Sequence, residues 1–216
     1  MVDAAFKRGL TEARSQPLRP ALSVTYLWRP GGYRFAQPES CTPPREGLGT
    51  WRRAGACAGW FPGAHSVRVV TVSAGTRGDV ASWLEIAREV EPLFGPMPDF
   101  ESTLQRSIGR GTALCVRDPS GQVLGGILLR AAPHTQITWL AVRSSARRRG
   151  VGHALVAEAL RRYRPPCEVL VDTFGEDSIE GYPARRLYES FGFVPGEYLP
   201  DGPEGGSRQR FRLCGQ

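Results

Sequence analysis

The sequence predicts a mixed α/β domain with a mostly antiparallel sheet and flanking helices, preceded by a segment of different character. Short runs of β-branched and apolar residues alternate with segments in which apolar residues recur every three to four positions. Turn residues separate these runs, most clearly at residues 118–121, which read Asp-Pro-Ser-Gly. Prolines recur throughout residues 1–64, where neither period persists. These patterns are typical of one α/β unit behind a proline-rich extension.

Residues 1–64 are rich in proline and arginine, and we predict that this extension is mostly disordered or loosely attached. Within it, residues 25–28 favour a short strand. A regulatory tail that binds a partner and a start codon placed too far upstream both stay open as alternatives. Residues 65–216 are long enough to bury a real core and form the predicted domain.

The elements of this domain follow from local signals along the chain. The first strand is expected at residues 67–72, and Asp79 is the expected N-cap of a helix that ends near Gly95. The later elements, in order, are a helix at residues 98–108, strands at 112–116, 123–129 and 136–142, a helix from 151, a strand at 168–173, a helix at 183–191, and strands from 193 and at 210–213. The predicted order is therefore β-α-α-β-β-β-α-β-α-β-β.

Residues 147–152 read Arg-Arg-Arg-Gly-Val-Gly and connect a buried strand to a helix. The N-terminus of a helix presents unpaired backbone N–H groups and partial positive charge, which together favour phosphate. Three neighbouring arginines strengthen that preference. We therefore predict a phosphate-binding turn here, with an ordinary solvated basic turn as the alternative.

The overall composition excludes several classes of protein. Five cysteines at irregular spacing imply neither a disulfide framework nor a zinc site, the three histidines form no metal-ligand cluster, and we expect no metal. No apolar run is long enough to span a membrane and no secretory signal follows Met1, so the expected location is the cytoplasm. The net charge of +7 keeps nucleic acid open as a partner, although charge alone is weak support.

Two motifs resemble the GNAT N-acetyltransferase superfamily. Leu140-Ala141-Val142 followed by Arg147-x-x-Gly150-x-Gly152 is similar to the pyrophosphate-binding pattern of that family. Residues 184–193, which read Ala-x-x-Leu-Tyr-x-x-x-Gly-Phe, are similar to a second signature of the family. The resemblance extends over about residues 66–213.

The resemblance implies direct transfer of an acetyl group from acetyl-CoA to a primary amine of a small molecule, a peptide or a protein. It implies that Tyr188 donates a proton to the leaving thiolate, while a packed core aromatic is the alternative reading of this residue. The backbone of Leu140 and Val142 would contact pantetheine, and the N–H near Val142 would polarise the thioester carbonyl. The residues implied in binding the coenzyme are Leu140, Ala141, Val142, Arg147, Arg148, Arg149, Gly150, Val151, Gly152 and His153.

Two positions depart from the family pattern. Arg148 stands where many members have glycine, which restricts the turn. Gly181 stands where many members have an asparagine that contacts pantetheine, so this contact is not expected from a side chain here.

The sequence leaves the acceptor side of the reaction open. Candidate general bases are Glu85, Asp99, Glu101 and Asp172, with a chain of water molecules as the alternative. Trp83, Phe100 and Trp139 either line an acceptor pocket or belong to the core. Alternative functions are a non-catalytic acyl-CoA sensor and, ranked last, a nucleic-acid-binding module. The identity of the acceptor and the formation of a homodimer stay open.

Overall fold

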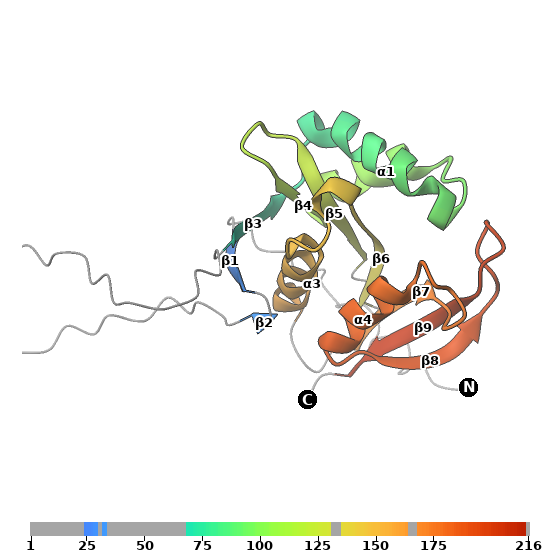
Figure 1. The fold of residues 1–216 in the computed structure, drawn as a ribbon. Helices are drawn as coiled ribbons and strands as arrows, with labels where there is room; N and C mark the ends of the chain where they lie inside the picture. Colours follow the sequence, from blue (N-terminus) through green and yellow to red (C-terminus); the bar gives the residue numbers. More distant parts are fainter. Residues whose placement is uncertain (1–23, 30–31, 34–67, 131–134, 164–167, 215–216) are drawn as a thin grey trace, which may run out of the picture.

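The computed structural model describes residues 24–29, 32–33, 68–130, 135–163 and 168–214 (Figure 1). The described strands are β1 (Val24–Arg29), β2 (Gly32–Tyr33), β3 (Arg68–Ala74), β4 (Ala113–Arg117), β5 (Val123–Arg130), β6 (Thr135–Val142), β7 (Val169–Phe174), β8 (Val194–Leu199) and β9 (Arg208–Leu213). The described helices are η1 (Arg77–Asp79), α1 (Val80–Phe94), α2 (Phe100–Gly109), η2 (Ser144–Ala146), α3 (Val151–Arg162) and α4 (Tyr182–Ser190). From β3 to β9, the order of strands and α-helices is the predicted one, so the fold class is confirmed.

The described strands form a single sheet in the order β2-β1-β3-β4-β5-β6-β7-β9-β8. β6 and β7 run parallel, and the other neighbouring strands run antiparallel. β1 lies within the segment assigned to the extension, and it pairs with β3 from Val24↔Val72 to Trp28↔Arg68. Most of residues 1–64 lie outside the described residues, and the prediction of disorder there stays a prediction.

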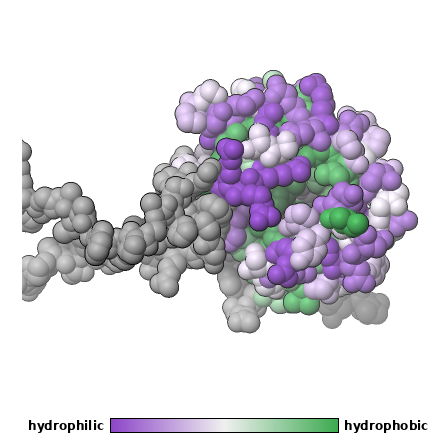
Figure 2. Space-filling view, viewed as in Figure 1, coloured by the Kyte–Doolittle hydropathy of each residue, from purple (hydrophilic) through white to green (hydrophobic). Residues whose placement is uncertain are grey.

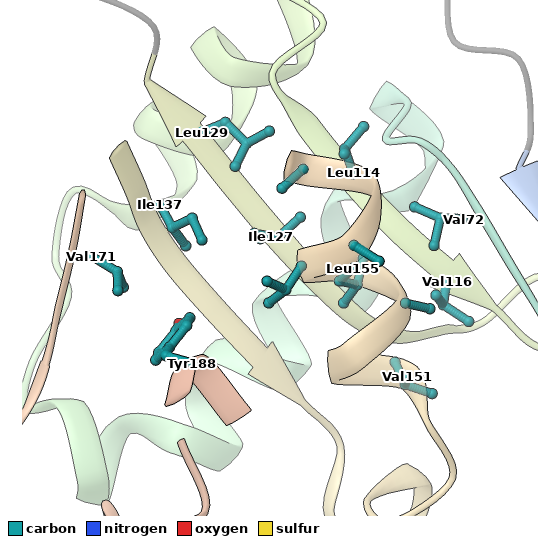
Figure 3. Close-up of a cluster of buried hydrophobic side chains, with 14 of the residues drawn as sticks. Val72, Leu114, Val116, Ile127, Leu129, Ile137, Val151, Leu155, Val171 and Tyr188 are labelled. Atoms are coloured by element: carbon teal, nitrogen blue, oxygen red, sulfur yellow. The ribbon is translucent and has the colours of Figure 1, made fainter. Parts of the chain in front are cut away.

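Helices cover the two faces of the central sheet separately. α3 and α4 pack on one face, where Leu155 of α3 and Tyr188 of α4 join side chains such as Ile127 of β5 (Figure 3). α1 and α2 pack on the other face, where Trp83 and Leu104 join side chains of β4, β5 and β6. The sheet therefore separates two hydrophobic clusters. The two motifs that resemble the GNAT family lie mainly on the side of α3 and α4.

Two glycines in β5 allow helices to approach this strand from both faces. A Cβ at Gly126 would lie 2.5 Å from Cζ3 of Trp83 in α1, and a Cβ at Gly125 would lie 2.8 Å from Cγ1 of Val151 in α3. Both distances are too short for real carbon atoms, so a larger residue would push a helix away from the sheet. Gly125 thereby sets how closely the first residue of α3 approaches β5.

The parallel pair β6 and β7 separates soon after it begins. Its register covers Thr135↔Val169, Gln136↔Leu170 and Ile137↔Val171, although β6 continues to Val142. On its other side β6 stays paired with β5 up to Gly125↔Val142, with a bulge between Leu128 and Leu129. The second half of β6 is therefore bonded to β5 and separated from β7, as the family resemblance implies.

Local details differ from the sequence-based expectations in two places. Asp79 precedes α1 as expected, but its carboxylate accepts hydrogen bonds from Thr76 and from the Arg117 guanidinium instead of capping α1. Asp79 therefore occupies the predicted N-cap position of α1, while its side chain belongs to the capping box of η1 and to the ion pair with Arg117. Gly109 is the last residue of α2, where the sequence predicted it just beyond the helix. Within the described residues, no helix combines the length and apolarity needed to cross a membrane.

Candidate functional site

The turn between β6 and α3 begins the helix with a glycine in the left-handed conformation. Gly150 has φ of 85° and is the N-cap of α3, without a side-chain hydrogen bond at the cap. The first helical bond runs from the Ala154 N–H to the Gly150 carbonyl at 2.9 Å. The N–H groups of Val151 and Gly152 precede this bond and point out of the helix end. Arg148 has φ of 58°, which costs about 1 kcal/mol for a residue with a Cβ.

The packing around position 152 does not require a glycine. A Cβ at this position would lie 3.4 Å from Cδ2 of Leu187 and 3.7 Å from Cγ2 of Val142, which are ordinary contacts. The missing side chain instead leaves the N-terminal backbone of α3 open. A phosphate could approach these N–H groups closely, so the residues of the turn fit the pyrophosphate of a coenzyme.

Carboxylates of α1 hold the turn in place, and sequence reasoning did not assign them this role. Glu89 Oε1 accepts a hydrogen bond of 2.6 Å from the Ser144 backbone N–H. Burial acts to raise the pKa of Glu89, but hydrogen bonds from Ser144 and the charges of Arg147 and Arg143 lower it below its usual value. Glu85 binds Arg143 Nη2 at 2.5 Å. The start of the turn is therefore tied to α1, across the sheet from α3.

Leu140 and Val142 turn their backbone groups toward the gap left by β7. The Arg143 N–H donates to the Leu124 carbonyl of the β5 side at 2.9 Å. Because successive residues of a strand direct their backbone groups to opposite sides, those of Val142 and Leu140 point away from β5. Nε of Arg147 donates a hydrogen bond of 3.2 Å to the Val142 carbonyl. The Val142 N–H and the Leu140 groups lie where the resemblance implies contacts with a coenzyme.

Two adjoining cavities lie along this gap. The turn cavity, of about 400 Å³, is bounded by α1, the end of β6, the Arg147–His153 turn and α4. Its lining includes nine of the ten predicted coenzyme residues, namely Leu140, Ala141, Val142, Arg147, Arg148, Gly150, Val151, Gly152 and His153, and leaves out Arg149. In Figure 2, hydrophilic residues cover the region of this turn, and hydrophobic residues are visible between α1 and α4.

The splay cavity, of about 560 Å³, lies between the separated parts of β6 and β7. Its walls include Thr138 and Trp139 of β6, Asp172 of β7, Tyr188 of α4 and the loop between β8 and β9. Phe94, Leu140, Phe174 and Ala184 line both cavities. The two cavities therefore meet at an apolar junction.

Tyr188 occupies a buried position in the splay cavity. Its side chain rises from α4 toward Ile137 of β6 and Val171 of β7 (Figure 3), and its ring meets Phe193 edge to face at 5.6 Å. The residue is 4% exposed, and no described residue hydrogen-bonds to its hydroxyl. Burial raises the pKa of Tyr188 above its ordinary value, so the phenol is protonated at neutral pH. Tyr188 is therefore a core aromatic that also lines the splay cavity.

His153 lies in the first turn of α3, with its ring 4.2 Å from the ring of Phe191. Burial lowers the pKa of His153 to about 4. The imidazole is therefore neutral at physiological pH and adds no positive charge to the turn cavity.

Asp172 is the candidate base that lines the splay cavity, and its carboxylate is already engaged. Nε and Nη2 of Arg210 donate to it at 2.7 and 2.9 Å, and Nε2 of Gln136 donates at 3.0 Å. These three hydrogen bonds occupy both oxygens of the carboxylate within the fold.

The other acidic candidates lie outside the two cavities. Glu85 pairs with Arg143, Glu101 accepts a hydrogen bond from Gln105, and Asp99 lines a shallow cavity beside α2. A base is not assigned among these residues. No described group of three or more His, Cys, Asp or Glu residues could hold a metal ion.

The three candidate acceptor-site aromatics are all buried, and they differ in which cavity they border. Trp83 is fully buried beneath β5 and lines neither cavity. Trp139 lines the splay cavity and stacks on Trp83 with ring centroids 5.5 Å apart. The ring centroids of Phe100 and Trp139 are 4.8 Å apart, and Phe100 lines the shallow cavity beside α2. Sequence periodicity could not separate these roles, because all three belong to the same cluster.

Gly181 departs from the family pattern for a visible packing reason. A Cβ at Gly181 would lie 2.5 Å from Cγ of Phe174. The ring of Phe174 thus occupies the space that a side chain at position 181 would need. Sequence reasoning did not select Phe174, since a phenylalanine at the end of a buried strand is ordinary core.

Comparison with known proteins matches residues 110–195 to a family model described as an acetyltransferase (GNAT) domain. Among solved structures, a GNAT-family acetyltransferase from Bacillus cereus ATCC 10987 is 17% identical, with a TM-score of 0.54 over 66% of this chain and 95% of that chain. A structure of the NatC complex bound to Gag peptide and CoA is 19% identical, with a TM-score of 0.57 over 68% of this chain and 99% of that chain.

Arabidopsis thaliana NAA60 in complex with acetyl-CoA is 16% identical, with a TM-score of 0.54 over 67% of this chain and 98% of that chain. At these identities the likeness concerns the fold. A comparison with curated proteins finds no match.

Proposed function

We propose, from the premise that this chain carries an acetyltransferase domain of the GNAT family, that it transfers an acetyl group from acetyl-CoA to a primary amine. Acetyl-CoA is a co-substrate in this proposal and supplies an activated thioester. The acceptor is a small molecule or the amine of a peptide or protein. The relatives named above in complex with CoA or acetyl-CoA share the fold, which supports the proposal.

The observation that supports the proposal most is that β6 separates from β7 after Ile137, where the two cavities lie along the gap. It leaves backbone groups of Leu140 and Val142 facing the turn cavity, beside the N-terminus of α3. A pyrophosphate at Gly150–Gly152 and a pantetheine arm along β6 would then lead toward the splay cavity. The amine would approach from the splay cavity, which is lined by Tyr188.

Each residue has a distinct role in this scheme. The turn binds the pyrophosphate, and the Val142 N–H donates a hydrogen bond to the thioester oxygen as negative charge develops there. The nitrogen of the neutral amine forms a bond to the acetyl carbon while the carbon–sulfur bond breaks. The Tyr188 hydroxyl gives its proton to the leaving sulfur and regains one from solvent, and the amine releases its proton to water in the splay cavity.

Burial affects both partners of the proton transfer. It raises the pKa of Tyr188, which makes the phenol a weaker acid. A thiolate in the same cavity is also poorly solvated, and its proton affinity rises for the same reason. The difference in pKa between the Tyr188 phenol and the coenzyme thiol therefore changes less than the raised pKa of Tyr188 alone suggests.

Calorimetric titration with acetyl-CoA tests the binding step. Gly152→Glu should abolish binding, because its carboxylate would lie against the pyrophosphate, while the ordinary contacts at this position let the fold survive. Gly109→Glu is the matched control, because Gly109 ends α2 with nothing near its Cβ site and lines neither cavity. A folded Gly152→Glu variant with undiminished affinity would refute the assignment of the turn.

Release of free thiol in the presence of a panel of amines tests the transfer step. Stimulated release identifies an enzyme and its acceptor class. Tight binding of acetyl-CoA without release for any amine would instead support the acyl-CoA sensor. Binding to nucleic acid that weakens steeply with salt would support the third alternative.

A further inference from the structure

Phe94 and Phe174 lie at the junction between the turn cavity and the splay cavity. Phe94 is the last residue of α1 and Phe174 the last residue of β7, so the pair spans the gap from opposite sides. Their ring centroids are 5.6 Å apart, with 39° between the ring planes. Both rings line both cavities. Together with Leu140 and Ala184 they form the apolar junction between the two cavities.

The ring of Phe174 is held rigidly in this position. The guanidinium carbon of Arg208 lies over it at 4.5 Å, and Nη1 of Arg185 donates to the Phe174 carbonyl at 3.1 Å. Gly181 lies against its base, where even a Cβ would collide. Phe174 is 8% exposed, although it borders two cavities. These contacts restrict the rotation of the ring that an incoming group meets.

We propose that the Phe94–Phe174 aromatic pair selects the acyl donor by admitting an acetyl group to the junction and excluding longer acyl chains. This inference rests on the proposed function, since it assumes that the thioester enters from the turn cavity. The acyl carbon must reach the junction to meet an amine from the splay cavity. Carbons beyond the acetyl methyl would have to pass the two rings to enter the splay cavity, and the packing of Phe174 restricts this passage.

The test measures the affinities of free CoA, acetyl-CoA, butyryl-CoA and hexanoyl-CoA by calorimetry for the wild-type protein, Phe174→Ala and Phe100→Ala. Each acyl-CoA affinity is divided by that of free CoA for the same variant, which removes effects on the rest of the coenzyme. Phe100 is the matched control, because it is also 8% exposed and in ring contact but lines neither the junction nor the turn cavity.

The wild-type protein should bind butyryl-CoA and hexanoyl-CoA at least tenfold more weakly than acetyl-CoA. Phe174→Ala should remove this penalty, and each further methylene that enters the opened space should tighten binding by up to about fourfold. Phe100→Ala should keep the wild-type order. If Phe174→Ala does not fold cooperatively, Phe174→Leu takes its place, with a smaller gain in the same direction.

Three results would overturn the inference. One is equal affinity of the wild-type protein for acetyl-CoA and hexanoyl-CoA. Another is an unchanged ratio in the folded Phe174 variants, and the third is the same change in Phe100→Ala. In each of these cases binding of free CoA leaves the proposed function standing. Failure of the wild-type protein to bind either CoA or acetyl-CoA would overturn the proposed function and this inference together.

Discussion

Tyr188→Phe should make the protein more stable and slower at the same time. The substitution removes one oxygen and keeps the ring against Phe193 and the surrounding cluster. No described residue accepts or donates a hydrogen bond at this hydroxyl, although the side chain is 4% exposed. The hydroxyl belongs to a residue that borders the splay cavity, so the fold compensates only part of the cost of burying it.

The magnitude follows from this environment. Burying a hydroxyl without a partner costs about 1–3 kcal/mol, and water in the adjoining cavity reduces that cost. The free energy of unfolding of Tyr188→Phe should therefore rise by up to about 1 kcal/mol, which raises Tm by roughly 2–4 °C for a chain of this size. Turnover should fall about ten- to a thousand-fold, the range for loss of one general acid.

Urea unfolding and steady-state kinetics with the best acceptor measure the two effects. The loss should appear in kcat more than in KM, since the proton is transferred only as the carbon–sulfur bond breaks. Tyr163→Phe is the matched control, because the Tyr163 hydroxyl is buried without a partner among the described residues, burial raises its pKa to about 12, and it lines neither cavity. Tyr163→Phe should change stability in the same direction and leave kcat unchanged. Full kcat in Tyr188→Phe across the pH range would refute the catalytic role.

Three further predictions concern stability. Burial lowers the pKa of His153 from 6.5 to about 4, so between pH 6.5 and 4 the unfolded chain binds a proton at this residue and the folded protein does not. Urea unfolding should therefore show that the free energy of unfolding falls by about 1–3 kcal/mol, discounted for partial exposure, as pH falls from 7 to 4. His153→Phe should reduce this loss. Gly181→Ala should destabilise the fold by about 1–3 kcal/mol through its collision with Phe174, and thermal unfolding of the double variant with Phe174→Ala should show less than the sum of the two single effects. Deletion of residues 1–66 should lower the unfolding free energy and increase light scattering relative to deletion of residues 1–23. The reason is that only the longer deletion removes β1 from the edge of β3. Equal stability and equal light scattering of the two deletion variants would show that the pairing of β1 with β3 contributes nothing.

The sequence by itself determined the order of elements and the glycine-containing turn before α3, for which phosphate binding stays a prediction. Both depend on local signals, since the periods of strands and helices and the glycines at 150 and 152 act over a few residues. The second signature also placed Tyr188 on an apolar helical face, and local pattern could not decide whether it was core or catalytic. The described structure makes it buried and cavity-facing at once.

Only the tertiary structure decided which distant residues meet at the site. The contact of Glu89 with Ser144 and the three hydrogen bonds that engage Asp172 join separate elements, and no local period encodes them. The pairing of β1 with β3 is equally non-local. Phe94 and Phe174 each read as ordinary core residues at the end of an element. They meet because β6 and β7 diverge after Ile137, and this divergence depends on how both strands pair with their other neighbours.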